Sequence, residues 1–582
     1  MTPVAGATGH RTIVALASIG LGAFILRLIG LQYGLPDVYN PDEVAIMARA
    51  LAFAKGSLNP HNFLYPTLYF YVLFAWVGIY LAFVYITGRV GSIAELQRLY
   101  FTDPTGIYTA GRMLGAVSGV ATVLLVHRLA ASLLNRRAGL AAALFMAAAP
   151  LAVRDSHYVK HDVFATMLIV AAYAAIVRVW PAPRQGGPRR CDLLVASAAC
   201  GAAFSTHYYC IFLALPLAWS IIQAWHPEGW RRVMRELCLA GVCTAAVFVA
   251  FSPFIAVEPW TAWRDIVANR AIVVDRAVEG GAFAPAMRYL DILWHDSMGF
   301  PVVLLGCAGA IWMLVAAPSR AVLLLAFPVP FFVFISNTVP ASRYLNPVLP
   351  FVAIFAASTL TSIAARWRLK AWMFWLVVAA CAAPAATASI RGDLFFRQAD
   401  TRTIARDYIE KQIPAGSTIL VQPYSTPLMQ SRDALVEALT RHVGSPEAAS
   451  TKFQLQLSIV PYPAPAYRLI YLGRGGLDVD RIYVDPSELG GNQRLTALRR
   501  LGVAFVVFKR YNTLDQEMLP FVEALEHEAR RIAVFAPFRP GVTGSERARI
   551  APFLHNTDTR IDEALERPGP PLEIWQLNGP GS

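Results

Sequence analysis

Two adjacent carboxylates, Asp42 and Glu43, follow Pro41 shortly after the first long apolar segment of the chain. A proline followed by two acids is a good start for a helix, because negative side chains interact favourably with the positive end of the helix dipole. A carboxylate at a membrane surface can also act as a general base that takes the proton from a hydroxyl group. Asp42 and Glu43 are therefore candidate catalytic residues as well as candidate helix-capping residues.

Other segments carry charged and imidazole side chains that we expect on the same side of the membrane. Residues 154–162 hold two acids, two histidines, one lysine and one arginine, directly beside two apolar segments. An arginine inside the first apolar segment is costly unless it pairs or reaches the headgroups. The candidates from these segments are Arg27, Asp155, His157, Lys160, His161, Asp162, His207, Arg343 and Tyr344. Each cation alone is more often a membrane anchor, but the whole set facing an acidic pair indicates a site.

A carboxylate and several cations at a lipid surface fit the transfer of a sugar from a lipid phosphate. The acceptor hydroxyl must lose a proton to a base, and the departing phosphate must have its negative charge stabilised. If the hydroxyl attacks the anomeric carbon directly while the phosphate leaves from the other face, the anomeric configuration inverts. These residue types therefore predict an inverting glycosyl transfer without a covalent enzyme intermediate.

The composition of the chain predicts a polytopic membrane protein. Of its 582 residues, 56% are hydrophobic and only 15% are charged, with a mean hydropathy of +0.46. A soluble fold has no interior large enough for that apolar surface. The net charge of +13 does not indicate nucleic acid, because the arginines form short clusters between apolar segments, the distribution that sets membrane orientation. The seven cysteines show neither disulfide nor metal spacing.

The positive-inside rule orients the apolar segments. Basic loops such as 135–137 and 366–370 should lie in the cytoplasm, and the loops that alternate with them should lie outside. This places the candidate site on the extracytoplasmic side of the plasma membrane, with the N-terminus inside and the C-terminal tail outside. Eleven spans are expected, at 13–35, 107–134, 138–153, 163–179, 193–206, 208–224, 237–256, 301–317, 321–335, 347–365 and 371–390.

One uncharged segment, 65–87, is not counted among the spans. If it crossed the membrane, every later loop would change sides and the basic loops would lie outside. Its many tyrosine, phenylalanine and tryptophan residues are typical of the headgroup level. We therefore expect a juxtamembrane or re-entrant element in the first outer loop.

The chain changes character after residue 390. Residues 391–582 carry charges, short alternating segments and helical patterns, which predict a soluble α/β domain after the membrane domain of residues 1–390. The glycines at Gly473, Gly475 and Gly476 are more typical of a turn than of a phosphate loop. The expected elements are strands at 417–422 and 503–509, helices at 401–411 and 514–531, and an edge strand at 572–577.

The order of several short motifs resembles that of the GT-C membrane glycosyltransferases. The sequence is similar in particular to bacterial relatives of dolichyl-phosphate-mannose protein mannosyltransferases and of the aminoarabinose lipid A transferase. The matching stretches lie within residues 1–365, at 39–43, 58–66, 111–114, 135–139, 150–162, 205–208 and 343–347. Each is loose by itself, and their order is the specific feature.

The resemblance implies a fold, a donor and an acceptor. The fold would be α-helical and polytopic, with about eleven transmembrane helices, juxtamembrane helices in the first outer loop and a C-terminal soluble α/β domain. The donor would be a polyprenyl-phosphate-linked hexose or pentose, and the acceptor a hydroxyl of a lipid, glycan or protein.

The resemblance also implies roles for individual residues. The acid of the first outer loop is taken as the catalytic base in the family, which corresponds here to Asp42, with Glu43 beside it. The second acidic loop shapes the site and corresponds to Asp162, with Asp155 as a further candidate. The remaining candidates would bind the donor phosphate or the substrate: Lys160, Arg343, His157, His207, Arg27 and Tyr344. His207 stands where a lysine is expected in close relatives.

The sequence leaves two questions open: whether the protein uses a metal ion, and which class of function it has. No cofactor is assigned, and a divalent metal stays open, since carboxylates suit hard cations and imidazole suits zinc. The candidate metal ligands are Glu43, His161 and Asp155. A transporter or flippase for a lipid-linked glycan would also need cations and acids, but no inverted repeat is visible. A scaffold role for the tail is the third reading. Clustering of ionisable residues at the outer edge favours surface chemistry.

Overall fold

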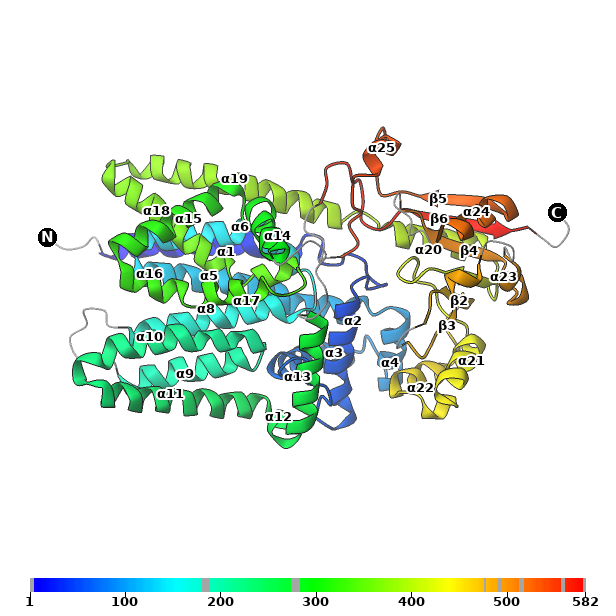
Figure 1. Ribbon diagram of the computed structural model, residues 1–582, viewed down its shortest axis with the longest axis horizontal. Helices are drawn as coiled ribbons and strands as arrows, with labels where there is room; N and C mark the ends of the chain where they lie inside the picture. The colour runs from blue at the N-terminus through cyan, green and yellow to red at the C-terminus, as the bar shows by residue number, and fades with distance from the viewer. Residues whose placement is uncertain are drawn as a thin grey trace.

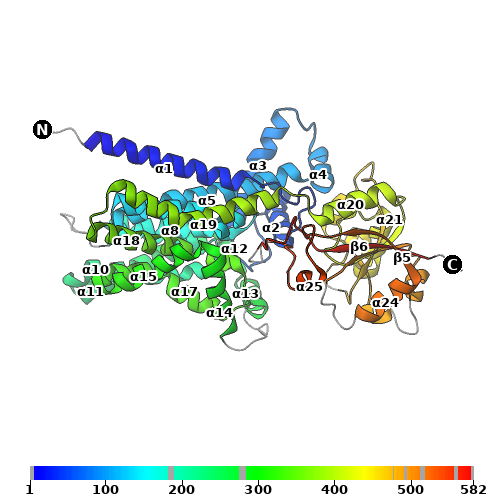
Figure 2. The same cartoon turned by 90° about the horizontal axis from the view of Figure 1, so that it is seen from above.

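The computed structural model describes residues 5–180, 189–273, 283–475, 478–489, 495–511, 518–555 and 561–578. Figure 1 shows a helical bundle formed by the N-terminal part of the chain and a smaller domain with a β-sheet at one end of it. Helix α1 begins at the end of the bundle remote from the sheet, and both views place the C-terminal domain at the other end (Figures 1 and 2).

Long apolar runs form the bundle helices, because in a membrane the backbone polar groups must be paired within each helix. These helices are α1 (Ala5–Leu28), α5 (Thr105–Leu133), α6 (Arg136–Ala148), α8 (His161–Val179), α9 (Arg190–Phe204), α10 (Ala214–Trp225), α11 (Trp230–Phe251), α15 (Phe300–Ala316), α16 (Pro318–Leu325), α17 (Pro328–Ile335), α18 (Leu349–Arg366) and α19 (Ala371–Phe396).

Shorter helices connect them: α2 (Pro41–Ala52), α3 (Leu68–Ile86), α4 (Ile93–Thr102), α7 (Pro150–Asp155), α12 (Pro253–Val257), α13 (Pro259–Val273) and α14 (Ala284–Ile292). Single helical turns lie at η1 (Phe53–Lys55), η2 (Tyr208–Leu213), η3 (His226–Glu228), η4 (Leu293–Ser297) and η5 (Ser342–Leu345).

Nine helical stretches among the described residues are long and apolar enough to cross a membrane. The protein is therefore an integral membrane protein, as its composition predicts. Each of the eleven segments expected to span contains bundle helix. Segment 65–87 forms α3, which also meets the length and apolarity of a span. In both views α3 runs across the direction of α5 and α19 at the end of the bundle near the sheet domain (Figures 1 and 2), the direction expected of a juxtamembrane helix.

Small side chains bring several helices of the bundle close together. Helix α5 packs against α6 and α8, and α15 packs against α18. Helix α6 is rich in alanine, and small residues let helix backbones approach closely. At Gly115 of α5, a Cβ atom would come to 2.9 Å from the carbonyl oxygen of Ser156. The loop after α7 therefore lies directly against α5.

The C-terminal domain contains one six-stranded sheet in the order β3-β2-β1-β4-β6-β5. Strands β3, β2, β1 and β4 are parallel, and β6 is antiparallel to both β4 and β5. The strands are β1 (Thr418–Val421), β2 (Arg468–Leu472), β3 (Ile482–Val484), β4 (Phe505–Lys509), β5 (Ala529–Phe535) and β6 (Leu572–Leu577). The helices are α20 (Thr401–Gln412), α21 (Arg432–Val443), α22 (Thr451–Leu457), α23 (Thr496–Arg500), α24 (Leu519–Glu528) and α25 (Gly544–Arg547).

Two expectations for this domain are wrong. Segment 572–577 is a strand, but it lies inside the sheet because β5 pairs with its outer side. The helix expected at 514–531 ends at Glu528, and the residues from Ala529 onward form β5; residues 514–517 lie outside the described part. Periodicity alone misses the change from helix to strand because α24 runs into β5 without a turn residue. Gly473 and Gly475 lie in the connection after β2, and Gly476 lies outside the described residues.

The sheet domain is tied to the chain that precedes α2. The guanidinium of Arg402 lies 3.8 Å from the ring centroid of Tyr39 and makes two hydrogen bonds to the carboxylate of Asp400, of 2.8 and 2.7 Å. Arg406 pairs with Asp37 at 2.5 Å. Helix α20 therefore holds the segment that leads into Asp42.

Candidate active site

Asp42 lies in the first turn of α2, which has a well-formed N-terminal cap. The side chain of Asn40 accepts a hydrogen bond of 3.0 Å from the backbone N–H of Asp42. Pro41 occupies the first turn, where its missing N–H leaves no helical bond unmade. Because successive helical positions point about 100° apart, the cap also determines that Asp42 and Glu43 face different neighbours.

Asp42 is paired with two cations from distant segments. The Nζ atom of Lys160 donates a hydrogen bond of 2.7 Å to Oδ2 of Asp42, and Nη2 of Arg343 lies 3.8 Å from the same oxygen. The side chain of Lys160 is 3% exposed, whereas that of Asp42 is 48% exposed. The carboxylate thus keeps an open side for a substrate while the cations lie on its covered side.

The two cations govern the charge of this carboxylate. Burial raises the pKa of Asp42, but the charges of Lys160 and Arg343 outweigh burial and hold the pKa at about 2. Burial and Arg343 lower the pKa of Lys160, while Asp42 raises it. The Asp42 carboxylate is therefore ionised, and it is a weak base as long as both cations face it.

Glu43 does not join this group, although it is adjacent to Asp42 in sequence. Its side chain is fully buried and accepts hydrogen bonds of 3.0 and 2.8 Å from Nε and Nη2 of Arg112. It also accepts a bond of 2.7 Å from the backbone N–H of Val159. Glu43, expected as a catalytic residue or metal ligand, here holds the loop before Lys160 against α5 and lies apart from the cations at Asp42.

Arg112 is the residue that the sequence reasoning missed. It lies in α5 inside an apolar run, and its Nη1 atom also donates to the backbone oxygens of Leu31 and Tyr33. The same argument that singled out Arg27, the cost of an arginine inside an apolar segment, would have found it.

Helix α7 positions Arg343. Nη2 of Arg154 donates a hydrogen bond of 2.7 Å to Oγ of Ser342, and Nδ2 of Asn346 donates one of 2.6 Å to Oδ2 of Asp155. These two bonds hold both ends of the turn η5, on which Arg343 lies. Asp155 is thereby occupied by protein partners, so it acts as a positioning residue in this structure and not as a free metal ligand.

Buried polar atoms without a hydrogen-bond partner gather beside the ion pair. Among the described residues, no hydrogen-bond partner is found for either carboxylate oxygen of Asp162, for Nδ1 of His161 or for Nε2 of His207. Nε of Arg343 lies 3.9 Å from Oδ2 of Asp162, which is an ion pair without a hydrogen bond. The ring of Tyr65 contacts both imidazoles, with centroid distances of 4.1 Å to His161 and 5.2 Å to His207. Unpartnered buried polar groups are rare, so this cluster is suited to hydroxyl groups of a ligand.

A cavity of about 480 Å³ opens beside this cluster. Tyr65, His207 and Tyr344 contribute its end nearest the ion pair, and Arg343 lies 5.0 Å from the Tyr344 ring. The remaining wall is largely apolar and is formed by Tyr208, Tyr209, Ile266, Phe334, Ile335 and Thr338, with Arg270 and Asn337. The cavity thus combines a largely apolar wall with polar side chains at the end nearest the ion pair.

Two expected site residues, Arg27 and His157, lie elsewhere. Nε of Arg27 donates a hydrogen bond of 3.2 Å to Oγ of Ser156, and the ring nitrogens of His157 lie 2.9 and 2.8 Å from the backbone oxygens of Val153 and Ile29. Both side chains are buried, and their hydrogen bonds join the end of α7 and the loop after it to the C-terminal part of α1 and the residue after it. The structure therefore does not place them at the Asp42 carboxylate.

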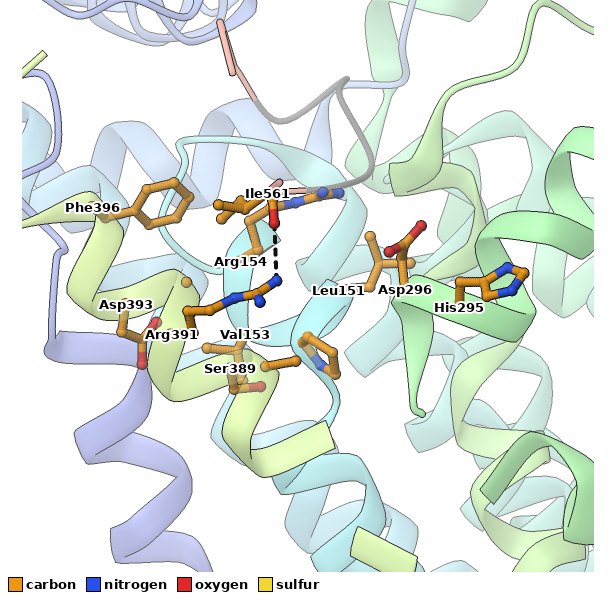
Figure 3. Close-up of a pocket in the computed structure, with 13 residues that line it drawn as sticks. Leu151, Val153, Arg154, His295, Asp296, Ser389, Arg391, Asp393, Phe396 and Ile561 are labelled. Atoms are coloured by element: carbon orange, nitrogen blue, oxygen red, sulfur yellow. Dashed lines mark hydrogen bonds between the residues drawn. The ribbon is translucent and has the colours of Figure 1, made fainter. Parts of the chain in front are cut away.

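Figure 3 shows a smaller cavity next to this buried pair. Its volume is about 190 Å³, and Arg154, Ser389, Arg391 and Asp393 are among the residues that line it. Nη2 of Arg391 donates a hydrogen bond of 2.9 Å to the backbone oxygen of Ile561, the dashed line in the figure. The side chain of Asp42 is not part of its wall, so this cavity is separate from the candidate active site.

The three candidate metal ligands do not form a common site in the described part of the chain. Within the described ranges, no three histidine, cysteine, aspartate or glutamate side chains lie close enough to hold a metal ion. Of the three candidate ligands, Glu43 and Asp155 are bound to protein groups, and the His161 ring packs against Tyr65.

Comparisons with known proteins find one similar family and several similar folds. Residues 107–257 match the family described as dolichyl-phosphate-mannose-protein mannosyltransferase. This segment includes Arg112, the loop that carries Lys160, and His207. No match was found among curated proteins.

Solved structures share the fold. The archaeal oligosaccharyltransferase AglB from Archaeoglobus fulgidus, in complex with an inhibitory peptide and a dolichol-phosphate, matches with a TM-score of 0.53 at 12% identity, over 98% of this chain and 89% of that chain. ArnT from Cupriavidus metallidurans, bound to undecaprenyl phosphate, matches with a TM-score of 0.50 at 16% identity, over 87% of this chain and 94% of that chain. At these identities the likeness concerns the fold.

The bundle, the short helices at its end and the C-terminal domain form a membrane protein whose fold is similar to those of AglB and ArnT. Within the bundle, residues 107–257 are similar to the dolichyl-phosphate-mannose-protein mannosyltransferase family.

Proposed function

We propose that the protein transfers a sugar from a polyprenyl-phosphate-linked donor to a hydroxyl acceptor, with inversion at the anomeric carbon. The observation that carries this proposal is the half-exposed carboxylate of Asp42 in contact with Lys160 and Arg343. A base and two cations are the groups that hydroxyl attack and phosphate departure require. The solved structures of similar fold contain dolichol-phosphate and undecaprenyl phosphate, which supports a lipid phosphate as the donor class.

The cavity beside the ion pair is the proposed donor site. Its apolar wall suits the first prenyl units. Arg343, which lies against the lining residue Tyr344, suits the phosphate together with Lys160, since charge-assisted hydrogen bonds to phosphate oxygens are strong. The unpartnered atoms of Asp162, His161 and His207 would then receive hydroxyl groups of the donor sugar. In this arrangement the anomeric carbon lies between the phosphate and the open side of Asp42.

The reaction follows from this placement. The acceptor hydroxyl oxygen forms a bond to the anomeric carbon while its proton passes to the Asp42 carboxylate. The bond between the anomeric carbon and the phosphate oxygen breaks on the opposite face, and the electron pair leaves with the lipid phosphate. Lys160 and Arg343 stabilise the charge that develops on that oxygen.

The ion pair of the free protein also supplies a means of activating the base. With both cations against it, Asp42 has a pKa of about 2 and accepts protons poorly. A bound phosphate competes with Asp42 for Lys160 and Arg343 and offsets their positive charge. The pKa of Asp42 then rises, because burial outweighs the weakened attraction of the two cations. Donor binding would thereby make Asp42 a better base at the moment when a proton must be taken.

We place the reaction on the extracytoplasmic face of the plasma membrane. The basic loops at 135–137 and 366–370 support this orientation through the positive-inside rule, and the acceptor would be a lipid, a glycan or a protein hydroxyl on that face. A single cysteine in place of Arg137 tests it: labelling by an impermeant maleimide only after the membrane is opened supports the orientation, and labelling of intact cells contradicts it.

Purified protein incubated with a panel of polyprenyl-phosphate sugars tests the reaction itself. The expected result is release of polyprenyl phosphate from at least one donor, with the sugar transferred to an added hydroxyl acceptor in inverted configuration. Release from no donor would contradict the proposal and favour the transport of a lipid-linked glycan.

A further inference from the structure

A second large cavity lies on the other side of α2, between this helix and the sheet domain. Its volume is about 530 Å³. Helix α2 contributes Pro41, Val44, Ala45 and Ala48, and the C-terminal domain contributes the opposite wall. Both views show α2 between the bundle and the C-terminal domain (Figures 1 and 2). The cavity therefore borders the helix that carries Asp42 and lies outside the donor site.

The carboxyl ends of two neighbouring parallel strands, β1 and β2, border this cavity. In open sheets with parallel strands, ligands bind beyond the carboxyl ends of the strands. Val421 and Gln422 at the end of β1 and Tyr471 near the end of β2 line the cavity.

The wall contains polar atoms that the protein leaves without partners. Ser425 and Thr426 follow β1, and their buried hydroxyl oxygens, like Nε of Arg481, have no hydrogen-bond partner within the described part of the chain. Ser425 is 1% exposed. A ligand or water that pairs with such groups removes the cost of leaving them unpaired, which favours a ligand that both donates and accepts hydrogen bonds.

Aromatic side chains line the same cavity. The guanidinium of Arg481 lies 4.8 Å from the ring centroid of Tyr471, and Phe453 contributes a further ring. Tyr424 is 64% exposed and has a φ of 60°, a conformation that residues other than glycine rarely adopt. This backbone conformation holds an exposed ring at the entrance, where it could cover a flat apolar ligand face.

The charges of the wall balance. Asp37, Asp478 and Asp480 oppose Arg402, Lys452 and Arg481. A site for a phosphate or a strongly acidic group would have an excess of cations. Equal numbers of acids and bases, placed among aromatic rings and hydroxyls, suit a neutral ligand with many hydroxyl groups, because carboxylates accept from sugar hydroxyls and guanidinium groups donate to them.

We infer that this cavity binds a carbohydrate, namely the glycan part of the acceptor. The inference rests on the proposed function and names the acceptor class for it. Val44, Ala45 and Ala48 form the face of α2 next to the one that carries Asp42, and a helix is only about 10 Å wide. A glycan held between α2 and the sheet can therefore extend one hydroxyl around α2 to the Asp42 carboxylate.

The experiment applies the full-length protein, labelled and purified in detergent, to an array of neutral and acidic oligosaccharides. Wild type is compared with the double variant Tyr424→Ala/Asp480→Asn, and with Asp433→Asn, which removes an exposed acid of α21 outside the cavity. Size-exclusion profiles and thermal unfolding establish that each protein is folded. If the double variant aggregates, Tyr424→Ala alone is used, because its side chain is largely exposed.

The expected result is binding of one group of glycans by wild type and by Asp433→Asn, with affinity reduced about tenfold or more in the cavity variant, since a ring face and a charged acceptor are lost together. Binding of no glycan by wild type, or equal binding by the cavity variant, would overturn the inference. Donor turnover by wild type separates the two proposals. Release of polyprenyl phosphate without glycan binding refutes only the cavity assignment, and glycan binding without release from any donor refutes only the transfer reaction.

Discussion

The amino group of Lys160 donates a hydrogen bond of 2.7 Å to the carboxylate of Asp42, although the two residues are 118 positions apart in the chain. This contact joins the first turn of α2 to the loop between α7 and α8. It separates the roles of the two adjacent acids, because Glu43 binds Arg112 instead. The predictions below follow from this relationship and from the contacts that maintain it.

The first prediction concerns the base. Asp42→Asn should reduce transfer about 100-fold or more, because the amide cannot accept the acceptor proton, while the folded protein remains intact. The measurement is release of polyprenyl phosphate by the purified variant. Asp291→Asn is the matched control, since Asp291 is 46% exposed and pairs with Arg288, and it should keep wild-type turnover. Undiminished turnover by Asp42→Asn would refute the role of Asp42.

The second prediction concerns pH. The pKa of Asp42 lies below its ordinary value, so the ionised pair with Lys160 exists above a pH of about 2 and is lost only as the pH falls through that value. Lys160→Met removes one of the lowering charges, and burial then raises the pKa. The acid limb of kcat/KM should move to higher pH, as measured by a pH–rate profile. Lys411→Met, on the surface of α20, should leave the acid limb at the pH of the wild type. If the acid limb of Lys160→Met also stays at that pH, Lys160 does not govern the pKa of Asp42.

The third prediction concerns the buried ion pair. Glu43→Ala leaves the charge of Arg112 uncompensated and should destabilise the protein by about 3–5 kcal/mol, seen as a lower midpoint of thermal unfolding in detergent. The double variant Glu43→Ala/Arg112→Met should regain much of this loss because no unpaired charge stays buried. A stable but inactive Glu43→Ala protein would instead assign Glu43 to the chemistry.

The fourth prediction concerns the close approach at Gly115. A Cβ at this position would lie 2.9 Å from the backbone oxygen of Ser156 and 3.3 Å from that of Tyr158. Gly115→Ala should therefore displace the loop that carries Lys160 and lower kcat about tenfold, since small displacements of charged groups weaken transition-state stabilisation strongly. Gly22→Ala is the control, because no atom lies within 4 Å of a Cβ there. Equal activity of the two variants would show that the loop tolerates the shift.

The fifth prediction concerns the link between the sheet domain and α2. Arg402→Met removes the stacking on Tyr39 and leaves the buried carboxylate of Asp400 without its cationic partner. Hydrogen exchange of residues 33–42 should rise, and turnover should fall without a change in the amount of folded protein. Arg441→Met, which breaks an exposed pair with Glu437 on α21, should change neither quantity. Unchanged exchange in Arg402→Met would show that α20 does not hold this segment.

Composition and local pattern were sufficient for the class of fold. The apolar runs predicted a helical membrane domain, and the mixed tail predicted an α/β domain, both of which the structure confirms. The cap at Asn40 and the helix after it follow from local chemistry, which depends only on neighbours in sequence. The resemblance to GT-C glycosyltransferases, carried by short motifs, agrees with the shared fold and with the family match at residues 107–257.

Other features could not be predicted, because they depend on contacts between distant segments. They are the neighbours of β6 and the partners of Arg27 and His157. Segment 572–577 looks like an edge strand by itself, because the pattern of a strand does not contain the identity of its partners. Arg27 and His157 carry the right chemistry for a phosphate site, but packing turns both toward backbone oxygens.

Sequence alone determined that a carboxylate pair begins a helix next to a membrane domain, and that cations follow in later loops. Only the tertiary structure decided which acid meets those cations. Adjacent residues on a helix point about 100° apart, so Asp42 faces Lys160 and Arg343 while Glu43 faces Arg112. That direction depends on the phase of α2 against α5 and the α7–α8 loop, which is a property of packing and not of the order of residues.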